Sequence, residues 1–147
     1  MSVQENKELM ERGYAAFSAG DLDTVMSLFD DDIEWVQPGQ SSVSGTFHGK
    51  NEVLEQFGRL AEKGLTVELK QLIAEGDTVV AITQVTAGGE TSEDADVFTI
   101  RNGRPSTSRC TATQRRSSAS TARSRWPLDN RLAQLLWAGA YRRMAHP

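Results

Sequence analysis

The stretch YAAFSAGDLDTVMSLFDDDIEW, residues 14–35, decides the fold because it holds a helix end, a whole second helix and the start of a strand. Met10, Tyr14 and Phe17 recur at the spacing of one helix face, and Gly20 is a suitable end for that helix. Asp21 is a good N-cap for a second helix. The apolar positions of that helix repeat every three to four residues: Leu22, Val25, Met26 and Phe29. The stretch therefore predicts a helical hairpin.

The chain after this hairpin alternates between strand and helix patterns. A short strand is expected over residues 33–37, with Trp35 facing inward, and a third helix over residues 51–63, stopped by Gly64. Three strand patterns follow, over residues 65–75, 77–87 and 95–101. Asn102-Gly103 is a strong hairpin signal, because both residues accept positive φ. One more antiparallel strand is therefore expected after Gly103.

These patterns resemble the NTF2-like superfamily, which includes SnoaL-like and ketosteroid isomerase-like proteins. Three segments carry the resemblance: residues 14–35, GTFHGKNEVLEQF at 45–57 and DVFTIRNG at 96–103. The match spans residues 7–103 and implies an α+β cone with a cystatin-like fold. Three N-terminal helices would then pack on a curved antiparallel sheet whose last strand is altered here. This fold hosts enzymes, binding modules and oligomerisation scaffolds, so it does not fix a function.

The charge of the chain is unevenly distributed. Of its 16 basic and 20 acidic residues, nine arginines and the single acid Asp129 lie after Gly103, which leaves 7 basic and 19 acidic residues in the first 103. An acidic body argues against nucleic acid and anionic membranes as partners. We therefore divide the chain into an NTF2-like body, residues 1–103, and an atypical arginine-rich segment, residues 104–147.

Three explanations of the segment 104–147 stay open. Crowding of Arg, Ser, Thr and Ala without Lys is typical of a G+C-rich gene read out of frame, and a one-base shift from Pro105 on can restore the ending expected for the family. Alternatively, the segment is an arginine-rich arm that binds phosphates. The third explanation is a solvated tail that contains a short amphipathic helix in NRLAQLLWAGAYRRM, residues 130–144.

The replaced ending should affect the sheet. Pro105 and the following small, polar side chains make a poor continuation of the predicted hairpin. Residues 106–113 can still pair through their backbone, because threonine tolerates the pleat. Their small side chains would nevertheless leave core volume unfilled at about 1 kcal/mol per methyl-sized gap. We expect a loosened wall of the cone.

The resemblance assigns a hydrogen-bond donor acid to Asp96. An acid among apolar strand neighbours such as Phe98 and Ile100 would have a raised pKa. In the isomerases, a second carboxylate moves the proton, but that position is Gln37 here, which cannot accept one. The isomerases also have a tyrosine on their first helix that donates a hydrogen bond to the substrate carbonyl. Its position corresponds to Gly13 here, and Tyr14 is the next residue. The isomerase mechanism therefore does not transfer as a whole, and the epoxide-hydrolase relay also lacks an arginine beside Asp94 and Asp96.

A pocket inside the cone is the expected binding site, because small-molecule sites are mostly apolar with a few polar groups. Besides Asp96, its expected lining is Tyr14, Phe17, Trp35, Gln37, Phe57 and Phe98. For each aromatic residue, plain core packing is the simpler alternative.

Other candidate sites are weak. His48 is expected to be an exposed loop residue. No His, Cys or acid spacing fits a metal site and no phosphate loop is present, so no cofactor is expected.

Two classes of function stay open. One is an isomerase- or cyclase-like enzyme acting on a hydrophobic or polycyclic molecule, with Asp96 as the acid. The other is a non-catalytic ligand-binding or dimerisation module. Relatives commonly dimerise through the outer sheet face, so a homodimer is expected. The sequence has no signal-peptide pattern and no membrane-length apolar run, so a cytoplasmic protein is expected.

Overall fold

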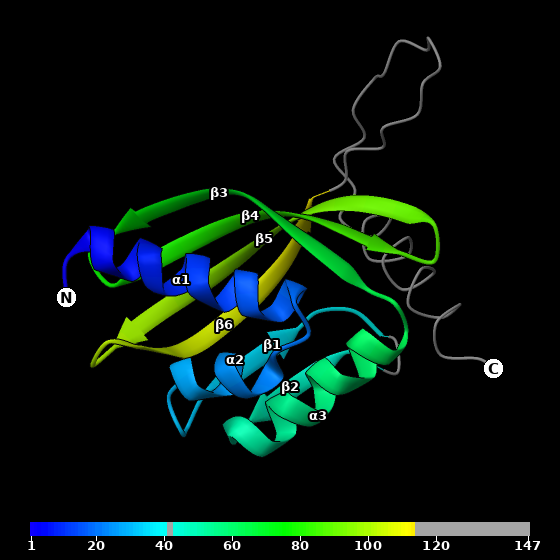
Figure 1. Cartoon of the computed structure of the whole chain (residues 1–147), viewed down its shortest axis with the longest axis horizontal. Helices are drawn as coiled ribbons and strands as arrows, with labels where there is room; N and C mark the ends of the chain where they lie inside the picture. Colours follow the sequence, from blue (N-terminus) through cyan, green and yellow to red (C-terminus); the bar gives the residue numbers. More distant parts are fainter. Residues whose placement is uncertain (41–42, 114–147) are drawn as a thin grey trace, which may run out of the picture.

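The computed structural model describes residues 1–40 and 43–113, and within them the chain forms three helices and six strands (Figure 1). The helices are α1 (Val3–Ser18), α2 (Leu22–Leu28) and α3 (Gly49–Glu62). The strands are β1 (Glu34–Gln37), β2 (Gly45–His48), β3 (Thr66–Glu75), β4 (Thr78–Ala87), β5 (Glu90–Arg101) and β6 (Arg104–Thr113).

The six strands form one mixed sheet in the order β2-β1-β6-β5-β4-β3. Neighbouring strands are antiparallel, except that β1 and β6 run parallel. Figure 1 shows the three helices on one side of the curved sheet, with α1 lying across the long strands. The predicted α+β cone is therefore confirmed, with a parallel pair where the sequence predicted an antiparallel sheet throughout.

The first two helices both begin at a side chain that caps them, and Asp21 is the cap predicted for the second. Ser2 Oγ accepts a hydrogen bond from the Glu5 amide at 3.1 Å, and the Glu5 carboxylate accepts one from the Ser2 amide, which completes a capping box. Gly20 follows α1 with φ 74°, a conformation that suits glycine. Asp21 Oδ1 then accepts from the Thr24 amide at 3.0 Å and caps α2.

Strict alternation along β4 and β5 decides which side chains face the helices. In β4 the buried positions are Val79, Ala81, Thr83, Val85 and Ala87. In β5 they are Asp94, Asp96, Phe98 and Ile100. Because successive strand residues point to opposite faces, both sets lie on the inner face. Two acids are thus carried into an otherwise apolar interior.

The predicted hairpin at Asn102-Gly103 is present, with φ values of 51° and 71° at its two central residues. It leads into β6, which pairs with β5 on one side and with β1 on the other. Pro105 is accommodated at an irregularity in the ladder, where the register shifts between Thr99 and Ile100. The sheet therefore includes the first ten residues of the segment 104–147, as the expected backbone pairing of residues 106–113 allowed.

One further difference concerns the segment between the first predicted strand and the third helix. Residues 45–48 form β2 and pair with β1, although the sequence indicated a Ser- and Gly-rich loop there. The register places Trp35 opposite Phe47, so β1 offers residues 45–48 a pairing edge that the local sequence does not reveal. The predicted helix at 130–144 and most of the arginine-rich segment lie outside the described residues, so their origin and role stay predictions.

Within residues 1–40 and 43–113, we find no helix with the length and apolarity needed to cross a lipid bilayer.

Candidate ligand cavity

A partly open cavity of about 80 Å³ lies between the helices and the inner face of the sheet. It has room for several water molecules or a compact organic molecule, since one water needs roughly 10–15 Å³ measured this way. All seven residues proposed from the sequence line it: Tyr14, Phe17, Trp35, Gln37, Phe57, Asp96 and Phe98. The lining also includes apolar residues of α1, α2, α3, β3 and β4, together with Gly13, Asp94 and Cys110.

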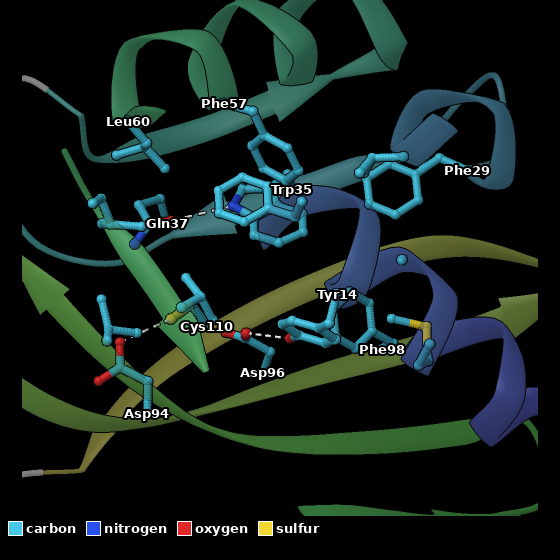
Figure 2. Close-up of a pocket in the computed structure, with 17 residues that line it drawn as sticks. Tyr14, Phe29, Trp35, Gln37, Phe57, Leu60, Asp94, Asp96, Phe98 and Cys110 are labelled. Atoms are coloured by element: carbon cyan, nitrogen blue, oxygen red, sulfur yellow. Dashed lines mark hydrogen bonds between the residues drawn. The ribbon is translucent and has the colours of Figure 1, made fainter. Parts of the chain in front are cut away.

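Tyr14 and Asp96 form the shortest polar contact in the cavity wall. The Tyr14 hydroxyl donates to Asp96 Oδ2 at 2.6 Å, from α1 to β5 (Figure 2). Asp96 is only 7% exposed. The family resemblance places the tyrosine of the isomerases at Gly13, but Tyr14 is the residue that reaches the acid. Its ring packs edge-to-face on Phe98 at a centroid distance of 6.2 Å, which helps to fix its direction.

Burial sets the protonation of this pair. The pKa of Asp96 is raised, because desolvation of the carboxylate outweighs the hydrogen bonds from Tyr14 and Cys110 that favour its ionised form. Burial likewise raises the pKa of Tyr14 well above its ordinary value, and the charge of Asp96 adds to the effect. Tyr14 therefore stays a neutral donor at physiological pH, while Asp96 retains its proton to higher pH than a surface aspartate.

Asp94 and Cys110 lie beside this pair. Cys110 Sγ donates to Asp94 Oδ2 at 3.9 Å, and Ser92 Oγ donates to Asp94 Oδ1 at 3.1 Å. Asp94 is 1% exposed. Burial, followed by the nearby charges of Asp96 and Asp94, raises the pKa of Cys110 well above its ordinary value, so the thiol is a poor nucleophile. Neither residue was in the predicted lining.

Alternation along the last strand would have identified Cys110. Ser106, Ser108 and Cys110 are buried, whereas Thr107 and Arg109 between them are exposed. Period-two spacing from Ser106 places Cys110 on the inner face, but only once this stretch is accepted as a strand.

Gln37 and Trp35 form the opposite side of the cavity. Trp35 Nε1 donates to Gln37 Oε1 at 3.2 Å, and Gln37 is 4% exposed. An indole N–H only donates, so this contact requires the amide oxygen on the Trp35 side. The amide nitrogen therefore points away from Trp35, as Figure 2 shows. It meets no hydrogen-bond acceptor among the described residues.

An aromatic cluster closes the cavity on the helix side. Phe57 of α3 contacts Trp35 edge-to-face at a centroid distance of 4.7 Å and Phe17 at 5.4 Å. Phe29 lies against Trp35 at 6.3 Å in a stacked arrangement. Such pairs add roughly 0.5–1.5 kcal/mol each beyond the burial of their area. The aromatic residues therefore pack the core and line the cavity at once.

His48 lies at the end of β2, directly before α3, and is exposed. Its Nδ1 is 3.7 Å from the Glu34 carboxylate, also at the surface. It does not line the cavity. Among the described residues, no group of three or more His, Cys, Asp or Glu side chains is arranged to hold a metal ion.

Three helices packed on a curved six-stranded mixed sheet are the arrangement of the NTF2-like class of α+β folds. The family model of the SnoaL-like domain matches residues 10–106. The chain therefore belongs to the SnoaL-like domain family.

Individual relatives agree with this assignment. The solved structure of Bal32a, from a soil-derived mobile gene cassette, is 34% identical and superposes with a TM-score of 0.70, over 75% of this chain and 90% of Bal32a. An NTF2-like protein of Burkholderia xenovorans, 23% identical, covers 77% of this chain and 92% of its own with a TM-score of 0.65, which shows the fold alone. An uncharacterized protein of Mycobacterium tuberculosis is 29% identical over 112 residues, 71% of this chain and 86% of the relative.

Proposed function

We propose that this protein binds a compact hydrophobic molecule bearing a carbonyl oxygen in its cavity, and that Asp96 acts on it as the acid of an isomerase- or cyclase-like reaction. The observation that carries the proposal is the placement of Asp96: it is 7% exposed, lines the cavity and accepts from Tyr14 at 2.6 Å. An acid held in this way can present a proton to a ligand in the cavity.

The chemistry follows from the raised pKa of Asp96. In its protonated form the carboxyl donates to the carbonyl oxygen, and the Tyr14 hydrogen bond to its other oxygen holds it in place. This donation stabilises the dienol that forms when solvent water removes a proton from the carbon between the carbonyl and the double bond. The resulting hydronium then returns a proton to the far carbon of the dienol, and Asp96 recovers its own proton as the carbonyl re-forms, so the isomerisation has no net gain or loss of protons. One such donor aimed at developing negative charge contributes on the order of 10²–10³ in rate.

The size of the cavity favours a single-ring ligand. Its volume of about 80 Å³ is below the roughly 300–1,000 Å³ typical of sites for drug-sized molecules. A polycyclic substrate would need the aromatic cluster around Phe57 to move. We therefore place compact cyclic ketones ahead of steroid-sized molecules.

A matched pair of variants tests the proposal. The probe is 3-cyclohexen-1-one, whose conversion to the conjugated 2-cyclohexen-1-one is followed by its ultraviolet absorbance. Wild type should accelerate the conversion, and Asp96→Asn should lower the rate by about 10²-fold or more. Asp77→Asn, in the exposed turn between β3 and β4, is the control and should keep the wild-type rate.

The non-catalytic alternative gives a different result in the same experiment. Gln37 occupies the position where the isomerases carry their base and cannot take a proton, which favours a binding module. In that case no conversion is seen in any variant, while cyclohexanone still shifts the Trp35 indole N–H signal in NMR spectra of wild type and Asp96→Asn alike. Absence of both conversion and binding would contradict the proposal as a whole.

Dimerisation through the outer sheet face is a second candidate, supported by an apolar strip there. Ile73 is 51% exposed and Val97 is 37% exposed, and both are paired with Val80 of the strand between them. We propose that this strip contacts a second copy. Val97→Glu should then halve the mass measured by light scattering, whereas Thr99→Glu, nearer the strand end, should have a weaker effect. If light scattering gives the mass of a monomer for the wild-type protein, the proposed dimer is contradicted.

A further inference from the structure

The choice of ligand by the cavity rests on the proposed function, in which the cavity binds a compact molecule. Two polar groups in the lining have unused hydrogen-bonding capacity. The Gln37 nitrogen has no acceptor among the described residues, although Gln37 is 4% exposed. Tyr14 occupies only one oxygen of Asp96. Gln37 and Asp96 both line the cavity, so these two groups can form hydrogen bonds with a ligand held there.

The strand register places the two groups at a defined separation. Asp96 of β5 is directly opposite Cys110 of β6. On the other side of β6, Val36 pairs with Arg109, so Gln37 and Cys110 follow one position further along. Gln37, Cys110 and Asp96 therefore form one row across three adjacent strands, as Figure 2 shows. With strands about 4.8 Å apart, the two outer backbones are roughly 10 Å apart.

Cys110 determines the room between the two polar groups. It lies in the middle of the row, it is 7% exposed, and its side chain is small. A larger apolar residue there would fill the space over which a ligand can extend. The rest of the lining is mainly aromatic and aliphatic, so it supplies contact area without further polar selection.

We infer that the cavity selects compact molecules with two oxygen groups at opposite ends, one accepting from the Gln37 amide nitrogen and the other bound at the Asp96 carboxyl, with the ring of the ligand over Cys110. Gln37 is thus a specificity-determining residue. Its orientation is fixed by the Trp35 indole, so the donor is aimed before the ligand arrives. Such pre-orientation reduces the entropy lost on binding.

A series of three ligands tests this with the wild-type protein. The probes are 1,4-cyclohexanedione with two oxygens, cyclohexanone with one, and methylcyclohexane with none. Affinities are measured by NMR titration, with the Gln37 side-chain NH₂ and the Trp35 indole N–H as reporters. The dione should bind at least about 10-fold more tightly than cyclohexanone, and it alone should shift both the Gln37 signal and the Asp96 carboxyl signal.

Variants assign each end of the ligand. Gln37→Met should reduce the affinity for the dione to that for cyclohexanone. Gln71→Met, on the exposed edge strand β3, is the matched control and should leave the series unchanged. Cys110→Leu should abolish binding of all three probes, whereas Cys110→Ala should retain it. Gln37→Met leaves the Trp35 indole without its hydrogen-bond acceptor and so could fail to fold. In that case, the affinities of the wild-type protein for the three probes and the shift of its Gln37 signal test the role of Gln37.

The outcomes separate this inference from the proposed function. Equal affinity of wild type for the dione and cyclohexanone would overturn the two-ended selection and leave the cavity a general binder of small ketones. Binding of none of the three probes would overturn both. Binding of the dione with no change at the Gln37 signal would overturn the role of Gln37.

Discussion

The Tyr14 hydroxyl donates to Asp96 Oδ2 at 2.6 Å, and this contact joins the first helix to a strand 82 residues later in the chain. It connects the fold with the chemistry of the cavity. The same hydrogen bond holds α1 on the sheet and directs the carboxyl that we propose to act on the ligand. Tyr14 therefore affects both stability and the protonation of Asp96.

Tyr14→Phe separates these two effects. The ring and its packing on Phe98 remain, while the hydroxyl is lost, so the free energy of unfolding should fall by about 1–3 kcal/mol. Because the Tyr14 hydrogen bond lowers the pKa of Asp96, its loss should raise that pKa further. Chemical denaturation measures the first effect, and carbon NMR of the Asp96 carboxyl the second. A pKa that falls in this variant would contradict the assigned donor.

Asp96 should make the stability of the protein depend on pH in a particular direction. Its pKa is raised in the folded state above the ordinary value of 3.8, so the native protein binds the proton more tightly than the unfolded chain. The contribution of Asp96 to the free energy of unfolding is therefore fully present below pH 3.8. It is lost as the pH rises from there through the pKa of Asp96 in the folded state.

Asp96→Asn removes this dependence while keeping an oxygen that accepts from Tyr14. The difference in unfolding free energy between the two proteins, measured across that pH range, should move steadily in favour of the variant as the pH rises. Comparing the two proteins cancels acids such as Asp21, whose lowered pKa gives a pH dependence of opposite sign. A constant difference would contradict the raised pKa.

The helices, the long strands and the hairpin could be predicted because they follow local rules. Asp21 is an N-cap wherever it precedes such a helix, and Asn102-Gly103 accepts positive φ whatever surrounds it. The alternation of Asp94, Asp96 and Phe98 also places the acids inside without knowledge of the rest. These signals need only a few neighbouring residues.

The remaining features depend on partners distant in sequence. β2 is a strand because β1 offers it a pairing edge, and a run of only four residues that begins with Gly45 carries little strand signal of its own. β6 forms in spite of Pro105 because it is paired on both sides. The Tyr14–Asp96 contact depends on the rotation of α1 over the sheet, which sequence alignment placed one residue away at Gly13.

The Cys110 thiol should be nearly unreactive in the folded protein. Its pKa is raised well above 9.0 by burial and by the charges of Asp96 and Asp94, so little thiolate is available. Since the sequence has a single cysteine, colour release from a disulfide reagent reports Cys110 alone. We expect the reaction to be at least about 100-fold slower than in denaturant. Equal rates would show that the cavity is open to the reagent.

Phe57 should be the most costly residue of the aromatic cluster to truncate. Its ring contacts Phe17, Phe29 and Trp35. Phe57→Ala should lower the free energy of unfolding by about 3–5 kcal/mol. Leu54→Ala, on the same helix but 36% exposed, is the control and should change it by about 0.5 kcal/mol. Similar losses in urea denaturation of the two variants would contradict the role of α3 as the cover of the cavity.

Two serines of β6 should respond in opposite ways to the same substitution. Ser106 Oγ donates to the Thr99 carbonyl at 3.1 Å, whereas Ser108 Oγ is buried without a hydrogen-bond partner among the described residues. Ser106→Ala therefore loses a made hydrogen bond and should cost about 1 kcal/mol in urea denaturation. Ser108→Ala removes an unpaired buried hydroxyl and should be neutral or stabilising, because desolvating that group opposes folding. Since the two residues are both inner-face positions of one strand, differences in strand propensity cancel. A larger loss for Ser108→Ala than for Ser106→Ala would show that the hydrogen bonding of β6 differs from that described.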